Sequence, residues 1–399
     1  MKRDPFPYLL YFVSVGVSLL FFYIYSSTVT WDVLDHDEIY FLQEGLKIRS
    51  GSADLGTLRP IGHPLLLAFF LSLSDNLIHV QLMLILVSSF SPPLFYLLMK
   101  KLTNQTCALV AACVLTIWPT RLFYAVSFFS QTAAFPIFLL FLLTFPRWYT
   151  GIILGTACLF HPSFLFFLPF VFVITAAEKI AWKKGLSIAL TALLTIMPWS
   201  LFISLQKGQF ILLSTNGASA LSGGINPNLY QQGYQFFQTP DGRISWRGPG
   251  LWLQTTGHLT EVEENSLPPR EKNALLMQRT LQWIRQHPLE TLYLEMAKWA
   301  NLWGFYPLFF SLPYRLWFGY IPLWLIECGT LFALIRYRKK LLPFARLWTL
   351  PIFISMIVLV SCGSWRYRYA ADAALIAFST MLFFYFPKQK KGLLCVSQS

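Results

Sequence analysis

Charged residues are scarce in this chain. Asp, Glu, Lys and Arg make up 12% of its 399 residues, whereas 55% are hydrophobic and 17% are aromatic. A typical soluble domain carries about twice that charged fraction, so the scarcity excludes a water-soluble globular protein. Long apolar stretches recur along the whole sequence, and several can cross a hydrocarbon layer of about 30 Å. Because lipid cannot satisfy backbone polar groups, these stretches predict α-helices.

The sequence also lacks the patterns of nucleotide, structural-metal and nucleic-acid sites. Its six cysteines lie in or beside apolar stretches or in the tail, without metal-ligand spacing. It contains no glycine-rich loop of the nucleotide-binding kind. The formal net charge of +13 comes largely from Lys and Arg between the apolar stretches, with no contiguous basic stripe. We therefore expect membrane lipids as partners and no nucleic acid.

Lysine and arginine gather at the ends of the apolar stretches. One threading places nearly all of these basic clusters in the cytoplasm, as the positive-inside rule requires. Both termini are then cytoplasmic and the number of spans is even. We predict an all-α polytopic membrane protein with about ten transmembrane helices, juxtamembrane helices and one long non-cytoplasmic loop. The predicted spans cover residues 8–28, 77–99, 105–123, 127–145, 149–160, 163–177, 185–206, 316–335, 345–362 and 370–386.

This threading divides the chain into three parts. Residues 1–206 form an N-terminal transmembrane module with a first outer, catalytic loop at 29–61. Residues 207–314 form the long non-cytoplasmic loop, which includes an amphipathic interfacial helix at 289–303. Residues 315–399 form a C-terminal transmembrane module with a short cytoplasmic tail. The expected location is a plasma or inner membrane, with a multi-pass topology and the active site on the outer face.

The first outer loop concentrates acidic residues. Ionisable side chains beside a membrane span are often functional. A solvated loop that uses acids because basic residues belong inside explains the same pattern equally well. The residues are Asp32, Asp35, His36, Asp37 and Glu38, all within seven positions.

Basic and amide residues follow in three further outer segments. Arg59 and His63 lie in a proline-rich turn before a juxtamembrane helix at 64–72, where Arg59 could equally be an interfacial anchor. Asn216 and Asn226 lie in a glycine-rich stretch, and their amides suit hydroxyl recognition, although a plain loop explains them nearly as well.

The last of these segments lies before the final span. Arg366 and Arg368 flank Tyr367 there, at the outer mouth of the last hairpin, where positive charge runs against the orientation bias. A guanidinium binds phosphate oxygens bidentately, so the pair suits an anionic head group; an anchor to lipid phosphates is the alternative. Under the predicted threading all four segments open onto one side of the membrane.

These motifs resemble those of a known family, the integral-membrane glycosyltransferases of the GT-C type, in particular its protein O-mannosyltransferase and aminoarabinose-transferase branch. Four motifs carry the resemblance, in the order that the family has them. They are a DE-Y motif at Asp37, Glu38 and Tyr40; an R-P-x-G-x-P turn at Arg59, Pro60, Gly62 and Pro64; a Pro-Trp pair followed by small and amide residues at Pro198, Trp199, Gly208, Phe210, Ser214, Asn216, Gly217, Asn226 and Pro227; and an R-Y-R motif at Arg366, Tyr367 and Arg368.

Two positions depart from the family pattern. Relatives often have Ser-Glu at the outer end of the fourth span, where this chain has Ser130 and Gln131. Many relatives have Arg-Pro after the broken helix, where this chain has His161 and Pro162. The first change removes a carboxylate, and the second weakens a phosphate contact or makes it pH-dependent.

The resemblance implies an inverting transfer of a monosaccharide from a polyprenyl-phosphate donor to a lipid, glycan or protein acceptor. Asp37 would act as the general base. Two alternatives stay open: a lipid-linked sugar transporter or flippase, and a catalytically inactive, transferase-like assembly subunit. A divalent cation could bind the acidic loop, although no ligand set has a definite spacing. The expected substrate-binding residues are Asp35, Glu38, Tyr40, Arg59, His63, His161, Asn216, Asn226, Arg366, Tyr367 and Arg368.

Overall fold

The structure is a computed structural model of the whole chain. It describes residues 4–28, 36–52, 54–232, 235–238, 244–247, 258–259, 263, 266–304, 314–361 and 365–389. The chain divides into two compact units. The first unit contains Met1–Leu213, Leu325–Leu350 and Tyr369–Ser399, and the second contains Ser214–Trp324 and Pro351–Arg368.

The secondary-structure elements described in the first unit are all helices. Two long helices, α17 (Tyr314–Tyr337) and α18 (Ala345–Leu359), begin in one unit and end in the other. The remaining elements are α1 (Phe6–Thr28), α2 (His36–Arg49), α3 (Gly62–Leu73), α4 (Leu77–Ser88), α5 (Ser91–Leu102), α6 (Gln105–Thr116), α7 (Pro119–Ala125), α8 (Gln131–Thr144), α9 (Thr150–Phe160), the 3₁₀ helix η1 (Pro162–Phe167), α10 (Leu168–Ala177), α11 (Trp182–Lys207), the 3₁₀ turns η4 (Arg338–Lys340) and η5 (Leu342–Phe344), α19 (Tyr369–Phe384) and α20 (Phe386–Gln389).

Four helical segments are long and apolar enough to cross a membrane, within the part of the chain that the structure describes. They are Phe6–Ile24, Leu77–Leu102, Trp182–Lys207 and Leu342–Leu359. A fifth arises if α6 and α7, which bend by 57° at their junction, form one broken span. These segments support an integral membrane protein. Every predicted span contains helix, but several helices are short, and the number of about ten stays a prediction.

The bend between α6 and α7 differs from the single span predicted at 105–123. Pro119 is the first residue of α7, and a proline cannot continue the hydrogen-bond ladder of a preceding helix. A proline also pushes the residue before it out of the helical conformation, and Trp118 is extended, with φ −66° and ψ 127°. The break is therefore a direct consequence of the local sequence.

Small residues bring α9 and α11 together. A Cβ added at Gly151 would lie 2.2 Å from Thr191 Oγ1 and 2.3 Å from the Ile188 carbonyl oxygen. One turn later, a Cβ at Gly155 would lie 2.6 Å from the Ala192 carbonyl oxygen. Glycines four residues apart lie on one face of a helix, so they allow the two backbones to pack closely, as small residues do in membrane helix pairs.

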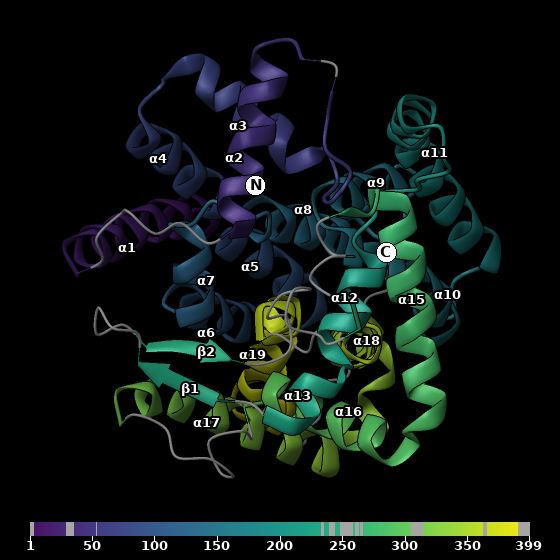
Figure 1. Cartoon of the computed structure of the whole chain (residues 1–399). Coiled ribbons are helices and arrows are strands. Elements are labelled where there is room, and N and C mark those ends of the chain that lie inside the picture. Colours follow the sequence, from purple (N-terminus) through teal and green to yellow (C-terminus); the bar gives the residue numbers. More distant parts are fainter. Residues whose placement is uncertain are drawn as a thin grey trace. The chain divides into compact units, whose positions relative to one another are not determined.

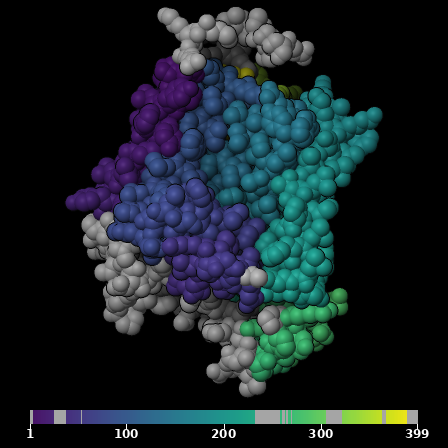
Figure 2. All heavy atoms as spheres, turned by 90° about the horizontal axis from the view of Figure 1, so that it is seen from above, coloured from purple at the N-terminus to yellow at the C-terminus, as the bar shows by residue number. Residues whose placement is uncertain are grey.

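Helix α2 packs against α3 over an apolar core (Figure 1). Gly45 of α2 allows this approach, since a Cβ there would lie 3.2 Å from Leu67 Cβ. The purple and blue atoms of this part of the chain form a continuous surface in Figure 2. The core comprises Phe41, Leu42, Leu67, Phe70, Leu71, Val80, Leu84 and Phe128.

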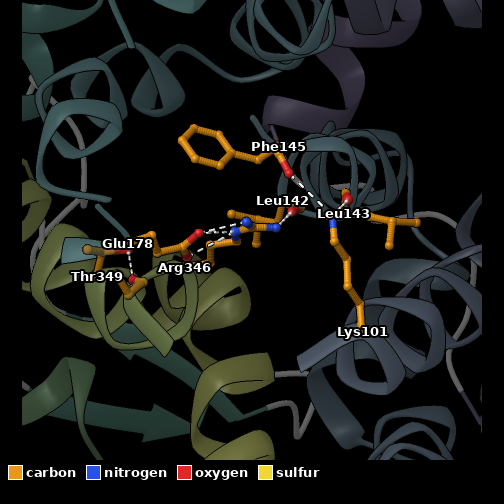
Figure 3. Close-up of polar contacts among 8 residues, drawn as sticks. Lys101, Leu142, Leu143, Phe145, Glu178, Arg346 and Thr349 are labelled. Carbon is orange, nitrogen blue, oxygen red and sulfur yellow. Dashed lines mark hydrogen bonds and ion pairs between the residues drawn. The ribbon is translucent and has the colours of Figure 1, made fainter. Parts of the chain in front are cut away.

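An exposed lysine and a buried arginine hold the carboxyl end of α8 in place (Figure 3). Lys101 donates to the carbonyl oxygens of Leu143 and Phe145, and Arg346 donates to that of Leu142. Arg346 also forms an ion pair with Glu178 at 2.6 Å. Carbonyls in the last turn of a helix lack helical partners, and positive charge is favourable there. The contacts tie the ends of α5, α8 and α10 to the start of α18.

The second unit combines helices with one hairpin. Its elements are α12 (Gly217–Gly224), α13 (Pro227–Gln232), β1 (Gln235–Gln238), β2 (Ile244–Arg247), α15 (Pro269–Gln286), α16 (Pro288–Leu302) and the 3₁₀ turn η6 (Trp365–Arg368). The strands are antiparallel, with Gln235 opposite Arg247. The all-α prediction did not include this hairpin, although aromatic residues and isoleucine favour strands. The interfacial helix predicted at 289–303 corresponds to α16.

Candidate functional site

The acidic turn of the sequence forms the amino end of α2. Asp37 and Glu38 lie in the first turn of this helix, and Lys47 and Arg49 lie in its last turn. This charge distribution complements the helix dipole. Arg59 donates from Nη2 to Asp37 Oδ1 at 2.6 Å, and the two side chains are 20% and 19% exposed. The pair is therefore partly shielded from solvent but still accessible.

A second carboxylate, that of Glu44, binds the segment before Arg59 to α2. Glu44 is buried, and its Oε2 accepts a hydrogen bond from the Gly56 N–H at 2.6 Å. A Cβ at Gly56 would lie 2.5 Å from the Tyr40 hydroxyl, so a larger residue here would require Tyr40 to shift. Burial, followed by the charge of Glu44, raises the pKa of Tyr40 to about 12. The Tyr40 side chain beside the ion pair is thus protonated and neutral.

Glu38 and His63 bind the backbone N–H and the backbone carbonyl oxygen of the same residue, Phe128. Glu38 Oε1 accepts from the Phe128 N–H at 2.8 Å, and His63 Nε2 donates to the Phe128 carbonyl oxygen at 2.7 Å. Both side chains are buried. Burial lowers the pKa of His63 to about 4, against a smaller opposing effect of the Phe128 carbonyl. Glu38 and His63 therefore anchor the connection between α7 and α8 next to the Asp37–Arg59 pair.

The two positions that depart from the family pattern contact each other. Gln131 Nε2 lies 3.3 Å from His161 Nε2, and His161 Nδ1 lies 2.7 Å from the Ser163 hydroxyl oxygen. His161 precedes Pro162, where α9 gives way to η1. The structure thus joins the start of α8 to the break after α9 through an amide and an imidazole side chain.

The Pro-Trp pair of α11 fixes the chain that leaves this helix. The Trp199 indole N–H donates to the Leu213 carbonyl oxygen at 3.0 Å, and Ser200 donates to the Ile211 carbonyl oxygen at 2.8 Å. Gly208 ends the helix in the left-handed conformation, with φ 62° and ψ 24°, which strongly favours glycine. The third motif therefore lies at the end of α11, where the chain that follows folds back against the last turns of this helix.

In the second unit, the amide of Asn226 is already bound within the protein. Asn226 is buried, its Oδ1 accepts from the Leu229 N–H at 2.7 Å, and its Nδ2 donates to the Ser222 carbonyl oxygen at 2.9 Å. These contacts cap α13. Asn216 precedes α12, is only partly buried and forms no side-chain cap. A sugar contact by either residue stays a prediction.

Arg368 and a lysine that the sequence did not single out meet near α16. Arg368 donates to the Leu302 carbonyl oxygen at 3.0 Å. Lys298 is fully buried, forms an ion pair with Glu295 at 2.7 Å and donates to the Ser361 carbonyl oxygen at 3.1 Å. Burial raises the pKa of Glu295, although Lys298 opposes the shift. A lysine within an amphipathic stretch gives no sequence indication of such burial.

A buried acid in the first turn of α19 was also missed. Asp372 is fully buried, and its Oδ2 accepts from the Trp118 indole N–H at 2.8 Å. Arg121 is buried near the α6–α7 bend, where it donates to the Thr116 carbonyl oxygen at 3.0 Å and to the Ser14 hydroxyl. Charged residues inside apolar segments are rare and often functional. A search for such residues in the sequence would have identified both Asp372 and Arg121.

Several predicted site residues lie outside this description. Asp35 is not among the described residues, and His36 and Arg366 are described without their side chains. Tyr367 is partly buried in η6. Asp37 belongs to the first unit and Arg368 to the second, so a shared pocket for the two stays a prediction. Among the described residues, no group of three His, Cys, Asp or Glu side chains could hold a metal ion.

No protein-family model matches the sequence, and no curated protein does. Among solved structures, the chain is similar to the oligosaccharyltransferase AglB from Archaeoglobus fulgidus in complex with an inhibitory peptide and a dolichol-phosphate, with 12% identity, a TM-score of 0.46, and coverage of 98% of this chain and 52% of that one. The Archaeoglobus fulgidus oligosaccharyltransferase tethered to an acceptor peptide is a second similar structure, with 12% identity, a TM-score of 0.43, and coverage of 95% and 49%. The chain spans about half the length of these proteins.

Proposed function

We propose that this protein is a membrane glycosyltransferase that moves a monosaccharide from a polyprenyl-phosphate donor to a lipid, glycan or protein acceptor. The observation that supports it best is the ion pair between Asp37 and Arg59. These residues belong to two separate motifs of the GT-C resemblance and are 22 positions apart. A carboxylate beside a guanidinium, both partly exposed, matches what an acceptor hydroxyl and a donor phosphate require.

The proposed reaction is a single displacement with inversion at the anomeric carbon. The acceptor oxygen forms a bond to this carbon while the bond from the carbon to the phosphate oxygen breaks. Asp37 takes the proton of the acceptor hydroxyl. The donor leaves as a polyprenyl phosphate, which needs no protonating acid but is stabilised by nearby positive charge. Arg59, Arg366 and Arg368 are the proposed sources of that charge.

The residues around Asp37 have supporting roles in this proposal. Arg59 favours the ionised form of Asp37 before the acceptor arrives. Glu38 and His63 position the connection between α7 and α8 through the Phe128 backbone, and Tyr40 forms a wall of the site. His161 and Asn216 are proposed to contact the donor or acceptor. The polyprenyl chain would remain in the bilayer beside the apolar helices.

A donor-binding subunit without turnover is the second candidate, and the contact between Gln131 and His161 favours it. The family resemblance places a carboxylate and a guanidinium at these positions, and this chain has an amide and an imidazole instead. If the loss of these charges abolished turnover, Gln131→Glu combined with His161→Arg would restore transfer. The proposed transferase predicts instead that the unmodified chain is active.

Mass spectrometry of membrane lipids and glycans tests the proposal in cells. Cells that produce the chain should contain a glycosylated product that is missing from cells without it. Asp37→Asn should remove this product. Asp54→Asn is the matched control, since Asp54 lies in the same outer segment and pairs with Lys207 but is 87% exposed. An unchanged product in cells with Asp37→Asn would contradict the role of Asp37.

A further inference from the structure

A basic cavity opens where α9 and α11 begin. It has a volume of about 660 Å³, and its lining includes Arg147, Trp148, Tyr149, Lys183, Lys184 and Ser187. That volume is in the range of small-molecule sites, roughly 300–1,000 Å³. Three of the lining side chains are cationic and none is acidic. The cavity therefore suits an anion.

The lysines of this cavity differ from three other basic residues of the first unit, which have partners within the protein. Lys100 pairs with Asp4, and Lys101 and Arg346 bind the carboxyl end of α8. In contrast, neither Lys183 nor Lys184 contacts an acceptor among the described residues. Both lie in the first turn of α11, where the helix dipole disfavours positive charge. An anion in the cavity would offset that cost.

Part of the cavity wall is held in place before any ligand binds. Arg147 donates to the Tyr149 hydroxyl at 2.6 Å, which orients the guanidinium. Thr191 of α11 donates to the Trp148 carbonyl oxygen at 3.2 Å, so the turn before α9 is held against α11. The close packing at Gly151 reinforces this contact. The ligand would order the exposed Lys183 and Lys184 side chains, whereas the Arg147 guanidinium is already oriented, which lowers part of the entropic cost of binding.

An apolar surface continues from the cavity along α11. Leu190 and Leu194 follow Lys183 and Ser187 at helical spacing on one side of the helix, and they are 52% and 59% exposed. Because this helix is a candidate membrane span, lipid would contact these leucines. Trp148, at the cavity, is 62% exposed, as is typical of the aromatic belt at a membrane interface. The occupant therefore combines an anionic head with apolar chains.

We propose that this cavity binds the phosphate head group of an anionic glycerophospholipid from the surrounding membrane. The phosphate contacts Arg147, Lys183 and Lys184, and the acyl chains lie along Leu190 and Leu194. The site is independent of Asp37 and Arg59, so it holds whether or not the chain transfers sugar.

Native mass spectrometry of the purified full-length protein in detergent tests the proposal. Phosphatidylglycerol and phosphatidylcholine with identical acyl chains are added in separate titrations. We expect wild type to retain one phosphatidylglycerol more tightly than phosphatidylcholine. Lys183→Gln combined with Lys184→Gln should weaken phosphatidylglycerol binding about tenfold or more, since each basic residue contributes on the order of 1 kcal/mol near an anionic lipid surface.

Arg338→Gln combined with Lys339→Gln is the matched control, because it removes two exposed charges from a basic turn that does not line the cavity. It should leave phosphatidylglycerol binding unchanged. Arg147→Gln provides a second variant in case the lysine variant does not fold, and it should also weaken binding. Equal retention of the two lipids, or an equal loss in the control, would overturn the proposal. Displacement of the lipid by millimolar inorganic phosphate would instead identify a site for soluble anions and would also overturn it.

Discussion

Acidification should destabilise the first unit through His63. This histidine is fully buried, and its Nε2 donates to the Phe128 carbonyl oxygen, while its Nδ1 has no hydrogen-bond partner among the described residues. Protonation at Nδ1 would therefore place a charge in a site without an acceptor. Burial accordingly lowers the pKa from its ordinary value of 6.5 to about 4. The neutral form is maintained in the folded protein.

The sign of the effect follows from proton binding. Between pH 6.5 and about 4 the unfolded chain protonates this histidine and the folded protein does not. The contribution of His63 to stability is therefore complete above pH 6.5 and is lost as the pH falls toward 4. The loss is roughly 1 kcal/mol per pH unit, and about 3 kcal/mol over the whole interval as an upper value.

Thermal unfolding in detergent, followed by tryptophan fluorescence at a series of pH values, measures this effect. His63→Gln is the comparison, because glutamine retains an N–H donor for the Phe128 carbonyl but does not titrate. Protonation of Glu38 and other acids affects both proteins, so the difference between them isolates His63. Wild type should lose stability relative to His63→Gln as the pH falls. Parallel pH profiles for the two proteins would refute the argument.

Three further substitutions test other parts of the structure. Glu178→Gln leaves buried Arg346 without its counterion, so the unfolding temperature should fall with a cost of about 3–5 kcal/mol; an unchanged unfolding temperature would contradict the buried pair. Gly151→Ala should destabilise the α9–α11 contact by about 1–3 kcal/mol, whereas Gly16→Ala, with no atom within 4 Å of its added Cβ, should not; equal melting temperatures would contradict close packing. Arg59→Ala should slow sugar transfer by about 10²–10³-fold, whereas Arg49→Ala, which breaks a pair with largely exposed Asp75, should leave it nearly unchanged; equal rates would exclude Arg59 from the site.

The helical character of the chain and its apolar segments could be predicted from composition and residue pattern. The division of those segments could not be predicted as well. Pro119 indicates the bend between α6 and α7. The bend was not predicted because the apolar residues from 105 to 123 were treated as one continuous span. Short helices such as α9, with 11 residues, are apolar like a span without having its length. Apolar composition indicates that a segment lies in lipid or in the protein core. Packing determines which of these segments cross the membrane.

The local chemistry of the site was partly predictable. The motifs identified Asp37 and Arg59 separately, but which arginine lies next to the acid depends on Glu44 and Gly56, which hold the intervening chain on α2. Asn226 was expected to bind hydroxyls because amides suit that task; the structure shows that its amide caps α13, which the sequence did not indicate, and the hydroxyl contact stays a prediction. A residue type indicates which contacts are chemically suitable, and the fold determines which of them are made.

Buried ionisable residues were the least predictable from the pattern. Lys298 belongs to an amphipathic helix whose polar face was expected in the membrane interface, but the side chain is fully buried beside Glu295. Asp372 lies inside an otherwise apolar helix and binds Trp118 from a distant part of the chain. Such contacts arise from long-range packing, which a local sequence window does not contain.

Single-turnover transfer from a labelled polyprenyl-phosphate sugar tests the central claim most directly. Purified wild type and Asp37→Asn are mixed with limiting donor in the presence of membrane extract as the acceptor source, and both donor retention and covalent transfer are measured. We predict that wild type transfers the label, whereas Asp37→Asn retains the donor but transfers it at least about 10²-fold more slowly. Transfer by Asp37→Asn at the wild-type rate, or donor binding by wild type with no transfer, would contradict the account.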